Sequence, residues 1–179
     1  ARDIRKIKEF SRLLELPAEK RHHFFICHHQ GSGGNQARIL YDQLTDLGCS
    51  VWYDNAVSSG ERNLDGMKRG VRESVTLLIF LSGRKETEKR LDENGRYQGV
   101  FTRWFCHEEM KTAREEGLHI IGVMETDERF GKPDMDAERE RAMTRIEGKP
   151  VHEEAAENLK LLDEVCFIER RTQQHELPE

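Results

Sequence analysis

The chain has 179 residues, 35% of them charged and 36% hydrophobic, which suits one water-exposed domain with a single core. Its formal net charge of -5 provides no basic face for nucleic acid. No apolar run approaches the roughly 20 residues of a membrane span, and no signal-peptide pattern opens the sequence, so we expect neither nucleic acid nor a membrane as a partner.

The four cysteines are widely scattered and form no CxxC pair: Cys27, Cys49, Cys106 and Cys166. Three of them lie in apolar or strand-like segments, which favours reduced, buried thiols over a disulfide framework. We therefore expect a cytoplasmic protein. The spacing also argues against a zinc site, and we predict no bound metal.

The chain opens with apolar residues at helical spacing: Ile4, Ile7, Phe10 and Leu14. They predict a helix that ends near Pro17, so residues 1–21 are interpreted as an N-terminal helix or linker. Two roles remain open for it: the helix packs on the domain that follows, or it joins that domain to a neighbouring one.

The first predicted strand is FFIC, residues 24–27, which is closed by the polar HHQ and the flexible GSGG. Asn35 is the predicted N-cap of a helix whose apolar positions step by three and four to Leu47, and Gly48 is its stop signal. The second strand is predicted in CSVWYD, residues 49–54.

A polar loop, NAVSSGERN, follows, and Leu64, Met67 and Val71 then mark one face of a second helix. The longest apolar run, residues 75–82, predicts a central strand that is covered on both faces. The long, charged connection over 83–99 is the best candidate for a mobile loop.

The second half of the chain continues the alternation of strands and helices. In order, the patterns predict a helix over 101–116, a strand over 119–124, a charged surface helix or loop over 134–146, an amphipathic helix over 153–162 and a strand over 165–168. Repeated strand–helix units imply right-handed crossovers and a parallel sheet. We therefore predict an α/β fold with a flavodoxin-like five-stranded parallel sheet, helices on both faces and the added N-terminal helix. The domain spans 22–171, and a tail occupies 172–179.

Ligands of an open parallel sheet bind beyond the carboxyl ends of its strands, where HHQGSGG, NAVSSGERN and the 83–105 connection converge. GSGG before a helix could offer N–H groups to a diphosphate, although a plain flexible turn explains it at least as well. Neighbouring strand residues point to opposite faces, so the histidine pairs do not suit one metal ion. His28 and His29 are instead candidates for lining a pocket.

The segment WFCHEEM places two adjacent carboxylates at the rim of the same crevice. With Cys106 and Met110 facing inward, Glu109 is expected at the edge of the buried stripe, on the same side as Phe105. Glu108 projects about 100° further round and is expected to be solvated. A half-shielded carboxylate suits a cationic or oxocarbenium-like centre, whereas a glutamate stabilised by the helix dipole needs no function. Both interpretations remain open at this point.

The order of the elements, together with five short motifs, resembles a TIR (Toll/interleukin-1 receptor) domain. In chain order the motifs are FFICHHQ, ILYDQLTDLGCSVWYD, a loop with Gly60, VTLLIFLSG and WFCHEEM. No single motif is specific, but their order and spacing between residues 22 and 167 are typical of the family.

The resemblance implies one of two functions in signalling and defence. Some TIR domains cleave NAD+ at the nicotinamide–ribose bond and give nicotinamide with ADP-ribose or a cyclic form of it. Others are non-catalytic adaptors that assemble with further TIR domains. The enzymatic kind uses the glutamate of a WCxxE motif. Aligning Cys106 with the motif cysteine gives that role to Glu109, whereas aligning on Trp104 gives it to Glu108. We prefer Glu109, because that alignment places Met110 at the buried position that closes the motif.

By the same resemblance, a group of residues lines the pocket for NAD+: His28, His29, Gln30, Gly60, Arg62, Trp104 and Phe105. NAD+ is then the substrate, and no cofactor is expected. Many active members carry an arginine where His29 and Gln30 stand, so Arg62 or Arg103 would have to supply charge for the phosphates.

Two features favour the enzyme over the adaptor: WFCHEEM keeps the aromatic residue and the cysteine of the motif, and the second-strand loop lacks the proline common in signalling receptors. The atypical segment after the first strand favours the adaptor. Self-association through TIR–TIR contacts is expected in either case, because in active members a neighbour's second-strand loop completes the site.

Overall fold

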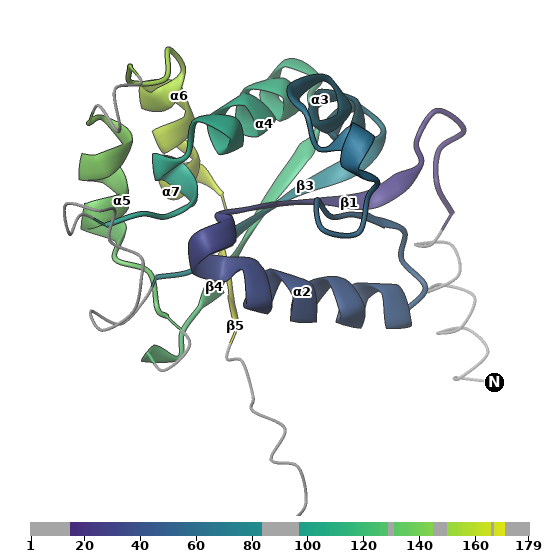
Figure 1. Ribbon diagram of the computed structural model, residues 1–179, viewed down its shortest axis with the longest axis horizontal. Coiled ribbons are helices and arrows are strands. Elements are labelled where there is room, and N and C mark those ends of the chain that lie inside the picture. The colour runs from purple at the N-terminus through teal and green to yellow at the C-terminus, as the bar shows by residue number, and fades with distance from the viewer. Residues whose placement is uncertain (1–14, 84–96, 129–130, 145–149, 166, 171–179) are drawn as a thin grey trace, which may run out of the picture.

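The computed structural model describes residues 15–83, 97–128, 131–144, 150–165 and 167–170 (Figure 1). The predicted N-terminal helix and the tail at 172–179 lie outside these residues, as does most of the predicted mobile connection.

Five parallel strands form one sheet, as the sequence predicts. They are β1 (His22–His28), β2 (Val51–Trp52), β3 (Ser74–Leu81), β4 (His119–Glu125) and β5 (Phe167–Arg170). Their order in the sheet is β2-β1-β3-β4-β5, so β3, the longest apolar run, is central. The order reverses beside β1, and this is the place where open α/β sheets bind ligands. β2 is shorter than predicted, and β5 begins two residues later.

Helices cover both faces of the sheet (Figure 1). They are α2 (Gln30–Asp46), α3 (Leu64–Arg72), α4 (Trp104–Glu115), α5 (Met135–Ala142), α6 (Ala155–Leu159) and α7 (Leu161–Glu164), with 3₁₀ turns η1 (Ser59–Glu61) and η2 (Val100–Thr102). The helix predicted over 153–162 is thus divided between α6 and α7. None of the helices described is long and apolar enough to cross a membrane.

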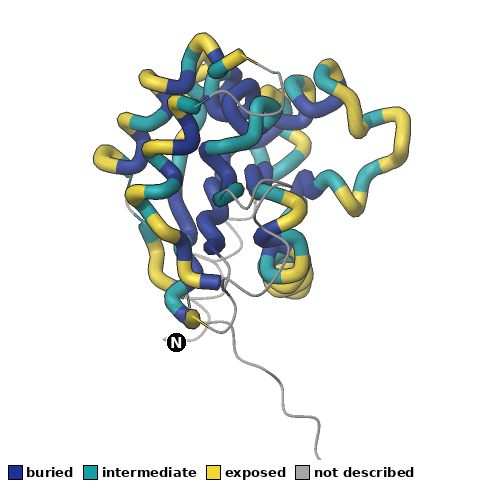
Figure 2. The backbone as a smooth tube through the Cα atoms, turned by 60° about the vertical axis from the view of Figure 1, so that its left-hand side comes forward, coloured by how far each residue is buried: buried dark blue, intermediate teal, exposed yellow. Residues whose placement is uncertain are grey.

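The sheet separates two hydrophobic clusters. On one face, α2 contributes Ala37 and Leu40 to a cluster with strand residues. On the other, α3 and α4 contribute Val71, Met110 and Ala113 to the larger cluster. Figure 2 shows the result, in which buried segments run through the middle of the molecule and exposed turns lie outside them.

The GSGG segment belongs to a helix, which corrects the predicted flexible turn and the predicted N-cap at Asn35. α2 begins at Gln30, with His29 as its N-cap. Gly33 is explained by the close approach of α2 to the sheet: a Cβ there would overlap the Ser82 hydroxyl and lie 3.3 Å from the Phe80 ring. At this position the glycine is a signal for close helix–sheet packing rather than for a loop.

The charged 134–146 segment is also more buried than predicted. Within α5, Glu138 is fully buried. Its carboxylate accepts hydrogen bonds from the Tyr97 hydroxyl at 2.9 Å and from the Phe101 N–H at 3.0 Å. These bonds connect α5 to η2, the turn that leads directly into α4.

Gly33→Ala is expected to lower the free energy of unfolding by roughly 1–3 kcal/mol, because the added methyl overpacks the contact between α2 and β3. Gly34→Ala is the matched control: its methyl would meet the Gln30 side chain at 3.3 Å and no atom of the sheet so closely. Alanine there should stabilise the helix by roughly 0.5–1 kcal/mol. Urea unfolding of the two variants measures the difference, and equal stabilities would contradict the packing argument.

Candidate functional site

The first turns of α4 lie on the carboxyl end of β1. The Cys106 thiol donates a weak hydrogen bond to the His28 carbonyl, with the sulfur 3.4 Å from the oxygen. One turn further along α4, Glu109 borders a cavity of about 200 Å³. The cavity is lined by Ile26, His28, Trp52, Asp54, Arg62, Asn63, Met67, Arg103, Phe105 and Glu109. Glu109 and Phe105, which the sequence predicts on the same side of the helix, both line this cavity.

The Glu109 carboxyl is buried, with 8% of the residue exposed. Burial raises the pKa of Glu109 from its ordinary value of 4.5 to about 8, and the nearby Asp54 charge adds to the shift. A hydrogen bond with the Cys27 thiol and the charge of Arg103 act in the opposite direction. Oε2 has no hydrogen-bond partner among the described residues. The carboxyl is therefore held at the edge of the cavity with unused capacity for a ligand.

Polar groups at the carboxyl ends of the first two strands form a hydrogen-bonded network beside this cavity. His28 Nε2 lies 3.7 Å from Asp54 Oδ1 and donates to Gln30 Oε1 at 2.9 Å. The same Gln30 oxygen accepts from Asn55 Nδ2 at 3.2 Å. This network connects the ends of β1 and β2, so it fixes one wall of the cavity.

Glu108 is buried rather than solvated, which corrects the sequence prediction. Its Oε2 lies 2.5 Å from Lys68 Nζ on α3, and its Oε1 lies 2.7 Å from His152 Nε2. Although burial raises the pKa of Glu108, these two partners hold it below the ordinary value. Side chains from α3 and from the segment before α6 cover the position that helical geometry left open, because α4 is packed on more than one side.

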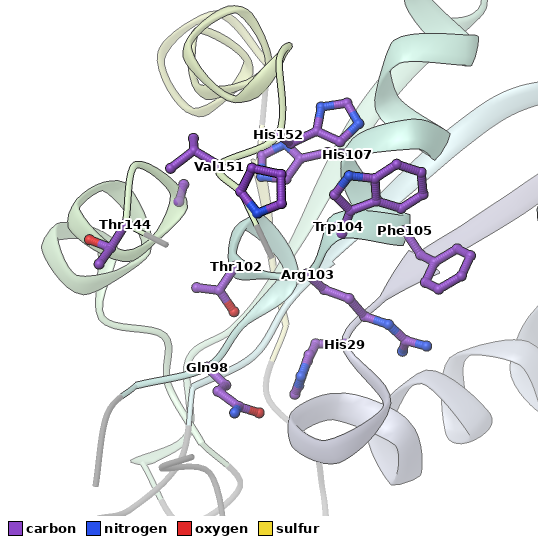
Figure 3. Close-up of a pocket in the computed structure, with 12 residues that line it drawn as sticks. His29, Gln98, Thr102, Arg103, Trp104, Phe105, His107, Thr144, Val151 and His152 are labelled. Carbon is purple, nitrogen blue, oxygen red and sulfur yellow. The ribbon is translucent and has the colours of Figure 1, made fainter. Parts of the chain in front are cut away.

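A second cavity, of about 290 Å³, shares Arg103 and Phe105 with the first (Figure 3). It is lined by His29, Gln98, Thr102, Arg103, Trp104, Phe105, His107, Ala142, Thr144, Pro150, Val151 and His152. The rings of His107 and His152 stack here, 5.2 Å apart between centroids. Burial lowers the pKa of His107 to about 4, so this imidazole is neutral at physiological pH.

The structure divides the predicted site residues between these two cavities. Those lining the Glu109 cavity are His28, Arg62, Phe105 and Glu109 itself, and those lining the second are His29, Trp104 and Phe105. Gln30 contacts the first cavity through His28. Gly60 is exposed in η1 and lines neither cavity.

The sequence analysis did not predict Trp52 and Asp54 as cavity residues, although both belong to the predicted strand segment CSVWYD. The signal that could have found them is their place at the carboxyl end of a strand beside the point where strand order reverses. It also missed Asn63 and Met67, which reach the cavity only because α3 packs against α4.

One comparison with known proteins supports the fold. Residues 24–160 match the family model described as TIR domain. Among solved structures, the chain is similar to a metazoan TIR-STING receptor from C. gigas, described in complex with 2′,3′-cGAMP, at 12% identity and a TM-score of 0.49. That match covers 82% of this chain but 40% of the other, so this chain spans less than half the length of that protein. A comparison with curated proteins found no match.

Glu109→Gln is expected to change how stability depends on pH. The folded chain holds the Glu109 proton more tightly than the unfolded chain, so the free energy of unfolding of the parent protein falls as pH rises from 4.5 to about 8. The amide cannot ionise and avoids this loss, which is on the order of a few kcal/mol when complete. Thermal unfolding at pH 5 and pH 9 compares the two proteins, and a variant that offers no advantage at the higher pH would contradict the burial argument.

Glu108→Ala is expected to lower the free energy of unfolding by roughly 3–5 kcal/mol, because it removes the shared partner of Lys68 and His152 from a buried position. Glu115→Ala, at the exposed end of the same helix, serves as the control and should change stability by less than about 0.5 kcal/mol. Urea unfolding measures both, and similar small effects would indicate that Glu108 is solvated after all.

Proposed function

This chain belongs to the TIR domain family, and from that premise we propose that it cleaves NAD+ at the nicotinamide–ribose bond. The observation that carries the proposal is Glu109, a buried carboxyl at the edge of a cavity, on the helix where the family resemblance puts the catalytic glutamate. A surface glutamate in water would have little effect on a reacting centre, because solvent would screen it.

The reaction requires one carboxylate and no separate acid. As the C1′–N bond breaks, the electron pair moves to the nicotinamide nitrogen, so a cationic leaving group departs neutral. The positive charge that develops on the ribose is stabilised by ionised Glu109. Water then bonds to C1′ and loses a proton to solvent, which gives ADP-ribose; attack by a nucleophile of the substrate itself gives a cyclic product instead.

The walls of the cavity suit the two ends of such a substrate. The partly exposed ring of Phe105 offers flat apolar surface for nicotinamide, whereas the Trp52 ring is buried and stacked on Phe25. Arg62 and Arg103 also line the cavity and bring the positive charge that a diphosphate needs, in place of the arginine missing after β1. Asp54 is placed to accept hydrogen bonds from hydroxyl groups of the ribose.

The proposal includes self-association of the domain. Gly60 lies in an exposed turn and lines neither cavity, although Arg62 and Asn63 at the end of the same loop line the Glu109 cavity. The tip of the loop after β2 therefore does not cover the site within the same chain. In the family resemblance this loop completes a neighbour's site. Activity is therefore expected to rise more steeply than in proportion to protein concentration.

The test is release of nicotinamide from NAD+, followed by chromatography at increasing protein concentration. The parent protein should release nicotinamide, and Glu109→Gln should reduce the rate by at least roughly 100-fold, as losses of transition-state charge stabilisation do. In the parent protein kcat/KM should rise with pH up to about 8, because Glu109 must be ionised and burial raises its pKa to that value.

Glu115→Gln is the control for this measurement, since it alters an exposed glutamate at the end of the same helix. It should retain the parent rate. Absence of nicotinamide release at every protein concentration would reject the enzyme and favour the alternative, a non-catalytic module that assembles with other TIR domains. Release that survives in Glu109→Gln would reject the assignment of this residue.

A further inference from the structure

Two cysteines that are distant in the sequence meet beside Glu109. Cys27 lies on β1 and Cys106 lies in the first turn of α4, and both side chains are buried. Ligand atoms of Cys27, Cys106 and Glu109 all lie within 4.8 Å of one another. The Cys27 thiol also interacts directly with both of the other groups. The contact between α4 and β1 brings the three groups together, and no CxxC spacing in the sequence predicts the cluster.

The donor set is one that thiophilic metal ions prefer. Two thiolates and one carboxylate form a three-ligand set that leaves a fourth position open, as in sites where Zn²⁺ holds an exchangeable group. The donor atoms of tetrahedral zinc lie roughly 3.3–3.8 Å apart, because its bonds are roughly 2.0–2.3 Å long. Ligand atoms that lie within 4.8 Å of one another would have to approach by up to about 1.5 Å to bind such an ion.

Two further observations point to a ligand at this place. Glu109 Oε2 is buried and has no hydrogen-bond partner among the described residues, which leaves an acceptor unused beside the two sulfurs. Glu109 also lines the cavity of about 200 Å³, so one member of the cluster borders open space while the two thiols are buried.

We propose that Cys27, Cys106 and Glu109 form a binding site for Zn²⁺. Each thiol gives up its proton to solvent as it coordinates the ion, and Glu109 binds as a carboxylate. The ion replaces the hydrogen bond from Cys106 to the His28 carbonyl and the contact between Cys27 and Glu109.

The site has a regulatory consequence, which rests on the proposed function. A carboxylate that coordinates Zn²⁺ cannot also stabilise a positive charge on ribose, so zinc and catalysis compete for Glu109. Zinc then inhibits the cleavage of NAD+ by occupying the catalytic group itself rather than a remote surface.

Binding of the metal is tested without NAD+, so the result does not depend on enzymatic activity. The reduced full chain is titrated with Co²⁺ and then with Zn²⁺. Co²⁺ should produce the charge-transfer absorption of thiolate coordination, and Zn²⁺ should abolish it by displacement. Cys27→Ala and Cys106→Ala should each weaken binding by more than roughly 100-fold, since even partners outside the ligand shell contribute 10- to 100-fold to metal affinity.

Cys49→Ala is the matched control, because Cys49 is a free, partly exposed cysteine away from the cluster. It should retain both the absorption and the affinity. Glu109→Gln removes one ligand with almost no change in shape, and it keeps the test decisive if a cysteine variant fails to fold. The proposed site is overturned if the parent protein shows no Co²⁺–thiolate absorption. It is also overturned if the absorption persists unchanged in Cys27→Ala, Cys106→Ala and Glu109→Gln.

The regulatory step has a separate measurement. If the parent protein releases nicotinamide, Zn²⁺ should suppress release in the parent and in Cys49→Ala at similar concentrations. Cys106→Ala should require at least roughly 100-fold more zinc relative to its own uninhibited rate. Equal sensitivity of Cys106→Ala and the parent overturns inhibition through this cluster. A chain that binds the metal through thiolates but releases no nicotinamide rejects the proposed function and leaves the metal site standing.

Discussion

The candidate site depends on one packing contact, between the first turns of α4 and the carboxyl end of β1. This contact buries Cys106 against the His28 carbonyl and brings Glu109 beside Cys27. It also closes the inner wall of the cavity that Glu109 shares with groups from β2 and α3. Without this contact the glutamate would project from a helix into water. Its charge would then be screened, and the pKa of its carboxyl would be close to the ordinary value.

Burial of Glu109 has opposite effects on stability and on chemistry. A carboxyl removed from water is costly to ionise, which raises its pKa to about 8 and makes its ionised form destabilising for the fold. The same loss of solvent strengthens the attraction of ionised Glu109 for a cation placed in the cavity. A cationic group of a substrate therefore offsets the free-energy cost of ionising buried Glu109. A metal ion bound by the neighbouring thiols would offset the same cost by coordinating the carboxylate.

The sequence predicted the sheet well because each strand has a local signature. Runs such as VTLLIFLS are continuous in the chain, and their apolar character does not depend on partners. The GSGG segment misled because glycine is found both in turns and at close contacts between helix and sheet, and only the position of Ser82 distinguishes the two. Likewise, the meeting of Cys27 with Cys106 is a property of the packed fold, and no spacing rule along one chain could reveal it.

Glu108 illustrates the limit of helical geometry most sharply. A rotation of about 100° between neighbours correctly places the two glutamates on different sides of α4, but it does not say what covers each side. The side of Glu108 is occupied by Lys68 and His152, which come from α3 and from the segment before α6. These contacts hold α4 at two points outside the cavity and so fix the direction in which Glu109 projects. The adjacent carboxyls thus have different roles. The ion pairs of Glu108 fix the orientation of α4, and the fixed helix keeps an unpaired carboxyl oxygen of Glu109 at the cavity edge.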